Sequence, residues 1–275
     1  MSERAHVVGL IGAGIDASLS PALHEAEAAA QGLDYEYRLL DIEGHELGAL
    51  LAQARDEGYS GVNVTHPCKQ DVVPHLDDLS PEAAALDAVN TVVFEADGRA
   101  VGHNTDASGF AESFTRGLPD ASLDKVVVLG AGGAGSAVAH AALRLGAREL
   151  VIVDTDSTRA AALANRLGAQ TGALDQLDDA DGLIHATPTG RAAHPGLPLA
   201  EDLLRPELWV AEVVYRPLET ELLRKARELG CRTLDGGGMA VMQAAGALQH
   251  FTGVTPDRER MLRHFQRLVA PVAVR

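Results

Sequence analysis

The sequence predicts an α/β protein of two domains, the first of them built on an open, mostly parallel sheet. Short apolar runs alternate with helical patterns along the chain, which is typical of parallel strands covered by helices. Hydrophobic residues make up 46% of the chain and aromatic residues only 4%, as expected of aliphatic strands buried on both faces. A length of 275 residues is sufficient for two cores of ordinary size.

The first half of the chain alternates regularly between the two kinds of element. An apolar run ends at Gly12 and Gly14, and Pro21 then begins an alanine-rich helical pattern. Pro67 cuts off the loop that follows the third strand. In chain order we expect strand 7–11, helix 21–31, strand 35–40, helix 47–55, strand 61–64 and strand 90–95.

A polar, glycine-punctuated segment at residues 102–110 separates this series from a second one, and we place a domain boundary near Asn104. The second series begins with a βαβ unit. We expect strand 126–129, loop 130–135, helix 136–145, strand 150–153 and helices 239–251 and 257–268. The predicted domains are residues 1–103, on which helices from residues 237–275 pack back, and residues 104–236.

The formal net charge of −16 argues against nucleic acid as a partner, because it repels a phosphate backbone. No run in the sequence approaches the roughly 20 apolar residues of a spanning helix, and the first residues lack the pattern of a signal peptide. Cys68 and Cys231 alone cannot form a disulfide framework. We therefore expect a cytoplasmic monomer or homodimer without a membrane partner.

A glycine-rich sequence follows the strand at 126–129 and begins the next helix. It satisfies the pattern G-x-G-x-x-G, whose glycines allow a tight turn and close approach to a pyrophosphate at a helix N-terminus. This context predicts a Rossmann-type domain that binds a dinucleotide, and the alternative is a tight turn without a ligand. The loop consists of Gly130, Ala131, Gly132, Gly133, Ala134 and Gly135.

The residues after the next strand favour NAD over NADP as the cofactor. Asp154 is placed to accept hydrogen bonds from the adenosine ribose and would repel the 2′-phosphate of NADP. Arg159 suits either stacking on adenine or a 2′-phosphate, but the carboxylates of Asp154 and Asp156 disfavour the phosphate. No metal-ligand spacing of histidines or carboxylates occurs in the sequence, so we expect no catalytic metal.

A dehydrogenase requires a group that accepts the hydroxyl proton as the hydride leaves. A lysine suits this role if its surroundings lower its pKa toward neutrality. Lys69 follows a strand end, and Asp106 lies at the proposed boundary, where a cleft between the domains would let the two face each other. Taken alone, such a pair is more often two surface charges. His66 and His103 flank these positions, but we prefer the lysine as the base.

Eight short motifs follow one another along the chain. They occupy residues 18–24, 63–69, 88–91, 104–110, 130–135, 186–188, 213–220 and 235–243. Together and in this order they resemble the motifs of the shikimate and quinate dehydrogenase family, and the resemblance extends from end to end. It implies a substrate domain followed by a cofactor domain, with a small hydroxy acid as the partner.

The resemblance also implies a role for individual residues. Lys69 and Asp106 would be the catalytic pair. The carboxylate and hydroxyls of the substrate would be held by Ser18, Ser20, Thr65, Asn90, Tyr215 and Gln243. The nicotinamide would be lined by Val213, Gly236 and Met239, with Thr187 near it. Taken singly, each of these residues also suits an ordinary structural role such as a helix cap or a turn.

Three departures from the family's usual pattern bear on function. Glu25 replaces a usual asparagine, Arg191 replaces a common methionine, and residues 154–156 read Asp-Thr-Asp instead of the Asn-Arg-Thr of NADP-dependent members. The resemblance together with this acidic sequence implies NAD-dependent oxidation of shikimate or quinate to the 3-dehydro acid. The alternatives are a strictly biosynthetic shikimate dehydrogenase, a dehydrogenase of aminoshikimate or another cyclitol acid, and a non-catalytic NAD-binding regulator.

Overall fold

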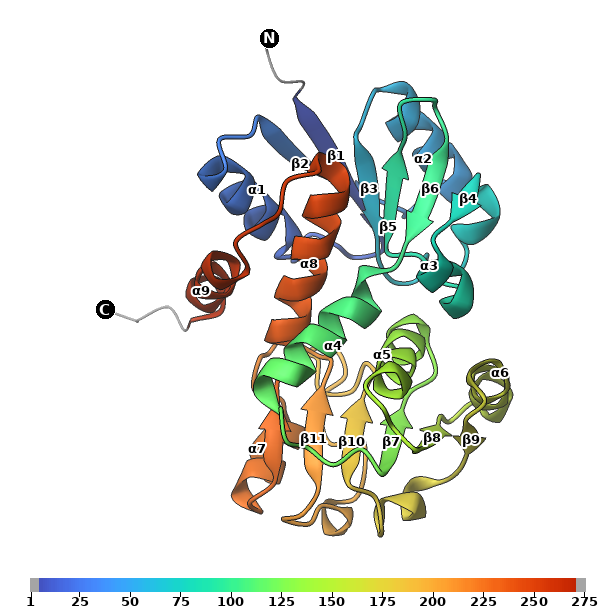
Figure 1. The fold of residues 1–275 in the computed structure, drawn as a ribbon, viewed down its shortest axis with the longest axis vertical. Coiled ribbons are helices and arrows are strands. Elements are labelled where there is room, and N and C mark those ends of the chain that lie inside the picture. Colours follow the sequence, from blue (N-terminus) through green and yellow to red (C-terminus); the bar gives the residue numbers. More distant parts are fainter. Residues whose placement is uncertain (1–4, 271–275) are drawn as a thin grey trace. The chain divides into compact units, whose positions relative to one another are not determined.

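Figure 1 shows the computed structural model, which describes residues 5–270 of the 275-residue chain. The chain divides into two compact units. Unit 1 consists of Met1–Thr105 and Val241–Arg275, and unit 2 of Asp106–Ala240. The chain passes between the units within two helices, α4 (Thr105–Gly117) and α8 (Gly237–Thr252). Within residues 5–270, no helix is both long enough and apolar enough to cross a membrane.

Unit 1 contains a six-stranded sheet that is parallel except at one strand. β5 runs antiparallel to both of its neighbours, and the other described pairings in this sheet are parallel. The predicted open, mostly parallel sheet is therefore confirmed. The strands lie in the order β2 (Tyr35–Asp41), β1 (His6–Gly12), β3 (Gly61–Val64), β5 (Thr91–Phe94), β6 (Ala100–His103) and β4 (Asp78–Leu79).

The strand β1, which lies between β2 and β3, is apolar on both sides, so the sheet of unit 1 has a core on each face. Val8 and Leu10 share one core with Phe251 of α8, whereas Ile11 shares the other with Leu51 of α2. The helical elements of this unit, besides its part of α8, are α1 (Ser20–Ala30), α2 (Leu47–Asp56), the 3₁₀ turn Val73–His75, α3 (Pro81–Leu86) and α9 (Arg258–Val269).

A buried ion pair holds α9 on α1. Glu27 is 2% exposed, and its carboxylate accepts hydrogen bonds from Nε of Arg260 at 2.7 Å and from Nη2 at 2.6 Å. The backbone N–H of Asp257 donates to the same carboxylate at 2.7 Å. Burial alone would raise the pKa of the Glu27 carboxyl, but these hydrogen bonds outweigh burial and lower the pKa. The two-pronged contact fixes where α9 begins on unit 1.

A histidine lies in the core of unit 1. His24 is 1% exposed, its Nδ1 lies 2.9 Å from the hydroxyl of Tyr35, and its ring centroid lies 4.8 Å from that of Tyr37. Burial lowers the pKa of this imidazole from 6.5 to about 3. The folded protein therefore keeps His24 neutral over a pH range in which the unfolded chain protonates it.

We expect His24 to make the fold sensitive to acid. Its contribution to stability is complete above pH 6.5 and is lost as the pH falls toward 3, because in this window only the unfolded state binds the proton. The loss amounts to about 1.4 kcal/mol per pH unit. The free energy of unfolding of the wild type and of His24→Asn should be measured with denaturant at several pH values. Between pH 6.5 and about 3, it should fall with decreasing pH more steeply in the wild type, by nearly this amount per pH unit. Parallel slopes would contradict the prediction.

Unit 2 contains a second six-stranded sheet, in which all described pairings are parallel. Its strands lie in the order β12 (Arg232–Leu234), β11 (Trp209–Glu212), β10 (Gly182–His185), β7 (Lys125–Leu129), β8 (Glu149–Val153) and β9 (Gln170–Thr171). Numbered from β7 onward, this is the 3-2-1-4-5-6 order of a Rossmann fold, so the predicted Rossmann-type domain is confirmed. The order reverses between β7 and β10, at whose carboxyl ends ligands bind in such sheets.

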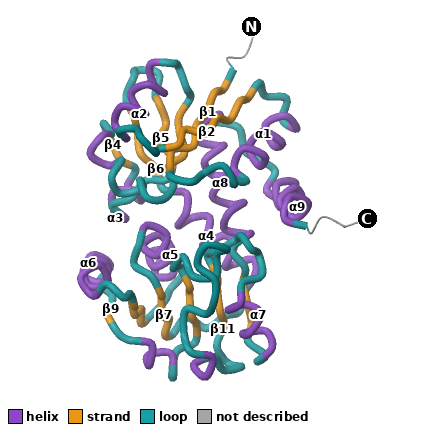
Figure 2. The backbone as a smooth tube through the Cα atoms, turned by 180° about the vertical axis from the view of Figure 1, so that it is seen from behind, coloured by secondary structure: helices purple, strands orange, loops and turns teal. Residues whose placement is uncertain are grey.

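Helices accompany the sheet of unit 2, and in Figure 2 they are the purple segments around its orange strands. Val127, Leu183 and Val210 from three adjacent strands form an apolar core with Leu222 of α7. The helical elements after α4 are α5 (Gly133–Arg144), α6 (Ser157–Leu167), the 3₁₀ turns Leu174–Leu177 and Glu201–Leu203, and α7 (Glu221–Glu228).

One helix was not predicted and the start of another was placed too late. Helix α4 begins at Thr105 within the polar segment 102–110, because Ala107, Phe110 and Phe114 recur at helical spacing and are buried. The chain divides into its two units after Thr105, next to the boundary expected near Asn104. Helix α5 begins at Gly133 instead of Ser136, so the second half of the glycine-rich sequence already has helical backbone. Glycine and polar residues obscured the helical period at both places.

Candidate active site

The loops after β1 and β3 lie against each other at one edge of the unit 1 sheet. The two strands are parallel neighbours, so their carboxyl ends meet. The backbone N–H of Thr65 donates to the carbonyl of Ile11 at 2.9 Å, and that of Ala13 donates to the carbonyl of His66 at 3.0 Å. A Cβ on Gly12 would collide with the side chain of Thr65, so this approach requires glycine.

Ser18 and Ser20 end the loop after β1 and begin α1. Both are half-buried, and the hydroxyl of Ser18 accepts a hydrogen bond from the backbone N–H of Ser20 at 3.2 Å. Glu25, which replaces a usual asparagine of the family pattern, accepts a hydrogen bond from the backbone N–H of Tyr37 at 3.1 Å. This contact gives Glu25 a structural role between α1 and β2.

A buried amide network begins beneath the β3 loop. Asn63 accepts a hydrogen bond from the hydroxyl of Tyr37 at 2.9 Å and donates to the carbonyl of Asn90 at 3.1 Å. Asn90, which is 3% exposed, donates to the hydroxyl of Thr105 at 2.9 Å and accepts from its backbone N–H at 2.8 Å. Asn90 therefore anchors the first residue of α4, and its predicted contact with a substrate stays a prediction.

Lys69 is half-buried in the turn after β3. Its backbone carbonyl accepts a hydrogen bond from Val89 at 2.8 Å, so the backbone of Lys69 is fixed beside the segment that leads to Asn90. Gln243 is half-buried on the part of α8 that belongs to unit 1. Asp106, 5% exposed, lies in the first turn of α4 and belongs to unit 2.

The glycine-rich loop of unit 2 has the geometry of a pyrophosphate cradle. Gly130 has φ +109°, which only glycine adopts readily, and a Cβ on Gly135 would collide with the carbonyl oxygen of Gly130. At Gly132, which caps α5 without a side chain, a Cβ would meet no described atom within 4 Å. The helix N-terminus is thus open to an anion, and the loop fits the pyrophosphate of a dinucleotide.

Asp154 ties this loop to the end of β8. Its carboxylate accepts hydrogen bonds from the backbone N–H groups of Ala131 at 2.7 Å and Asp156 at 2.9 Å, and from Nη2 of Arg159 at 3.1 Å. Burial alone would raise the pKa of Asp154, but the hydrogen bonds from Asp156, Ala131 and Arg159 lower it. Asp154 is therefore a fixed negative charge beside the loop, with the exposed Arg159 held on it.

The predicted nicotinamide residues follow the carboxyl ends of three adjacent strands of unit 2. Thr187 comes after β10, Val213 after β11 and Gly236 after β12. A Cβ on Gly236 would meet the carbonyl oxygen of Val213 at 2.5 Å, so glycine allows these two segments to touch. Met239 is 7% exposed in the first turn of α8. Burial raises the pKa of the Tyr215 phenol, and the positive charges of Arg191 and Arg216 oppose that shift.

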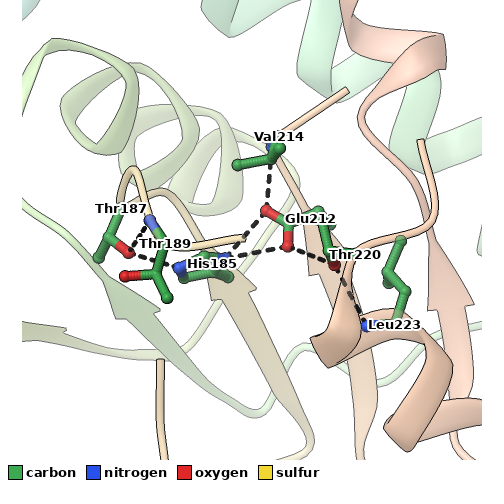
Figure 3. Close-up of polar contacts among 7 residues, drawn as sticks. All are labelled: His185, Thr187, Thr189, Glu212, Val214, Thr220 and Leu223. Atoms are coloured by element: carbon green, nitrogen blue, oxygen red, sulfur yellow. Dashed lines mark hydrogen bonds and ion pairs between the residues drawn. The ribbon is translucent and has the colours of Figure 1, made fainter. Parts of the chain in front are cut away.

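Figure 3 shows a buried polar chain that the sequence did not predict. Nδ1 of His185 lies 2.9 Å and 3.0 Å from the two carboxylate oxygens of Glu212, and its Nε2 lies 2.5 Å from the hydroxyl oxygen of Thr187. The side chains of His185 and Glu212 are both 0% exposed. The only signal in the sequence was a histidine and a glutamate placed directly before the motifs at residues 186–188 and 213–220.

The predicted site residues fall into two groups, one in each unit. Unit 1 holds Ser18, Ser20, Thr65, Lys69, Asn90 and Gln243. Unit 2 holds Asp106, residues 130–135, Asp154, Arg159, Thr187, Val213, Tyr215, Gly236 and Met239. Among the described residues, no group of three or more histidine, cysteine or acidic side chains is arranged to hold a metal ion.

Comparison with known proteins identifies the family. Residues 10–92 match the shikimate dehydrogenase substrate binding domain, and residues 112–188 match the shikimate / quinate 5-dehydrogenase family. The chain is 61% identical to a shikimate dehydrogenase (NADP⁺) of Streptomyces avermitilis, over 100% of both chains. It is 47% identical to a quinate/shikimate dehydrogenase (NAD⁺) of Corynebacterium efficiens, over 96% of this chain and 99% of that relative.

A solved structure is similar over the same length. Quinate dehydrogenase from Corynebacterium glutamicum in complex with NAD superposes with a TM-score of 0.90 at 46% identity, covering 96% of this chain and 99% of that one. The two family matches and the similar proteins together cover sequence from both units. The chain belongs to the shikimate/quinate dehydrogenase family.

Proposed function

We propose that the protein oxidises shikimate or quinate to the 3-dehydro acid with NAD as the hydride acceptor. The observation that carries the cofactor assignment is the buried carboxylate of Asp154, which is held on the glycine-rich loop by the N–H of Ala131. The family supports the chemistry, because the relatives are named as shikimate or quinate dehydrogenases. Unit 1 is the substrate domain and unit 2 the cofactor domain in this proposal.

Lys69 and Asp106 handle the proton. In its neutral form, the amine of Lys69 accepts the hydroxyl proton of the ring alcohol, while the carboxylate of Asp106 stabilises the ammonium that results. A bound NAD would supply the redox chemistry by accepting the hydride from the C–H bond of the ring alcohol. The products are a ketone, the reduced cofactor and one proton, so the step is balanced.

Neutral hydrogen-bonding side chains hold the substrate in this proposal. A polyhydroxylated acid offers several hydroxyls and one carboxylate, which suit Ser18, Ser20, Thr65 and Tyr215. A buried donor or acceptor left unpaired by a wrong substrate costs about 1–3 kcal/mol, so such a set selects strongly among similar acids. Asn90 and Gln243 complete the proposed set. One amide N–H of Asn90 holds the Thr105 hydroxyl, and its other N–H is proposed to meet the substrate.

A substrate panel tests the proposed function. Cofactor reduction should be followed by absorbance with shikimate, quinate and a cyclitol that lacks the carboxylate, each with NAD and with NADP. Turnover of either acid with NAD, and none of the cyclitol, is the expected result. Binding of NAD without turnover of either acid would instead favour a non-catalytic regulator of the same fold.

Replacement of Asp154 should change the choice of cofactor. Asp154→Asn keeps an oxygen that can accept from Ala131 but removes the charge that repels a 2′-phosphate, and it releases the guanidinium of Arg159. We expect the ratio of kcat/KM for NAD to that for NADP to fall at least about tenfold. The matched control is Asp124→Asn, which removes another carboxylate paired with an arginine, Arg148 at 3.1 Å, but directly before β7, at the end of that strand opposite the glycine-rich loop, and it should leave the ratio unchanged. An unchanged ratio in Asp154→Asn would refute the assignment.

A further inference from the structure

The surroundings of Glu212 determine which nitrogen of His185 carries a proton. The backbone N–H of Val214 donates to Glu212 at 2.9 Å, and the hydroxyl of Thr220 does so at 3.0 Å. That hydroxyl accepts from the N–H of Leu223 at 3.3 Å, which leaves its own proton for Glu212. An ionised carboxylate only accepts, so the adjacent Nδ1 of His185 must donate. In the neutral ring, Nε2 is then an acceptor.

This tautomer determines the direction of the Thr187 hydroxyl. Since Nε2 of His185 lies 2.5 Å from Oγ1 and has no proton, the hydroxyl of Thr187 donates its single proton inward. The backbone N–H of Thr189 donates to the same oxygen at 3.3 Å. A hydroxyl has two lone pairs, so one remains. Thr187, which is half-buried, therefore meets a ligand as a hydrogen-bond acceptor.

We propose that Glu212 and His185 are positioning residues that make Thr187 an acceptor for the carboxamide N–H of a bound nicotinamide. The inference rests on the proposed function. Thr187 follows β10, where the strand order of the sheet reverses, and it lies beside the glycine-rich loop, since a Cβ on Gly130 would meet its Cγ2 at 3.1 Å. A carboxamide has a donor end and an acceptor end, and the opposite tautomer of His185 would turn the Thr187 proton outward and select the carbonyl end. The buried pair thus selects one orientation of the carboxamide.

A purely structural role for the pair makes a different prediction. Glu212 also links β11 to α7, because Thr220 caps that helix. If this were its only role, substitutions would lower the stability of unit 2 without changing which cofactor analogues bind. The two roles are therefore separated by ligand preference and not by activity alone.

Three ligands measure the preference directly. NAD carries the carboxamide, its 3-acetylpyridine analogue replaces the amide nitrogen with a methyl group, and ADP-ribose lacks the ring. Equilibrium binding to the wild type should be about tenfold tighter for NAD than for the acetylpyridine analogue, the loss expected for one hydrogen bond with an unpaired acceptor. Equal dissociation constants for NAD and the analogue would overturn the inference.

Two variants test whether the preference depends on the buried chain. In Glu212→Gln, the amide oxygen that accepts from the N–H of Val214 still lies 2.9 Å from Nδ1 of His185, but the amide nitrogen replaces the oxygen at 3.0 Å, so a proton on Nδ1 is no longer required. In Thr187→Val, the hydroxyl is removed. Thr187→Val should bind NAD and the analogue within about twofold of each other, Glu212→Gln should show a smaller preference for NAD than the wild type, and both should leave ADP-ribose binding unchanged. The double variant should resemble Thr187→Val, because Glu212 acts through that hydroxyl.

The control is Trp209→Phe, which removes a 2.8 Å hydrogen bond to Ser122 at the opposite end of β11. It should lower stability and keep the tenfold preference. If Glu212→Gln fails to fold, Thr187→Val still decides, since a preference retained there overturns the inference. Nitrogen NMR of the His185 ring in the wild type provides a ligand-free test, and a proton on Nε2 would refute the tautomer. Failure of the wild type to bind NAD at all would instead refute the proposed function.

Discussion

Lys69→Ala should lower kcat by about 10²–10⁴-fold, the range associated with a positioned general base or acid. Alanine leaves no group to accept the hydroxyl proton as the hydride departs. The hydrogen bond from Val89 to the backbone carbonyl of Lys69 does not depend on the side chain, so we expect the variant to fold, and denaturant unfolding checks this. NAD binding should also be preserved, since the proposed cofactor residues belong to unit 2. Steady-state kinetics with the acid that the wild type oxidises measures the effect.

Two further variants show whether the loss is specific to the amine. Lys225→Ala makes the same change of charge on α7, where the lysine pairs with Glu201 at 3.1 Å, and should leave kcat within about twofold. Lys69→Arg keeps the positive charge but replaces the base with a group that stays protonated, and it should be nearly as inactive as Lys69→Ala. An alanine variant that retains a tenth or more of the wild-type kcat would rule out Lys69 as the base.

Gly135→Ala should destabilise unit 2 by about 3 kcal/mol or more. The added Cβ would collide with the carbonyl oxygen of Gly130, which is backbone and cannot move aside without opening the turn. Gly132→Ala is the matched control in the same loop, because its Cβ would meet no described atom within 4 Å. The free energy of unfolding of that variant should lie within about 0.5 kcal/mol of the wild-type value.

The same two glycines should separate stability from cofactor binding. Gly132→Ala places a methyl group where the pyrophosphate approaches the helix N-terminus, so its dissociation constant for NAD should rise at least tenfold despite its normal stability. Denaturant unfolding and NAD titration of both variants measure the two effects. Normal stability of Gly135→Ala would contradict the close approach of Gly135 to the Gly130 carbonyl. Normal NAD affinity of Gly132→Ala would contradict a pyrophosphate site at the N-terminus of α5.

The elements that could be predicted from the sequence are those whose pattern is local. β1 and β8 are short aliphatic runs that end at Gly12 and directly before Asp154, β3 is cut off soon after by Pro67, and the glycine-rich turn is recognisable from its own residues. Helix α4 could not be recognised, because glycine and polar residues alternate with the apolar positions Phe110 and Phe114 that pack inward. Helical spacing was present there, but weaker than the turn signal.

The parts of the candidate site that were missed depend on contacts between distant segments. His185 and Glu212 meet because β10 and β11 are parallel neighbours whose last residues are in register. The register of two strands 27 residues apart is set by the whole sheet and leaves no local pattern. Glu27 likewise meets Arg260 only because α9 packs on α1. Glu25 was noticed as unusual, but its contact with the backbone of Tyr37 required the fold.

The ion pair between Glu27 and Arg260 has a consequence for the order in which a nascent chain can fold. Unit 2 is one continuous stretch of sequence, whereas unit 1 needs Phe251 to cover Val8 and Leu10, and Arg260 to satisfy Glu27. A ribosome therefore releases the strands of unit 1 first but completes that unit last. Until Phe251 and then Arg260 emerge, the face of β1 that carries Val8 and Leu10 has no cover and Glu27 has no partner, so the central unit 2 can fold before unit 1 is complete.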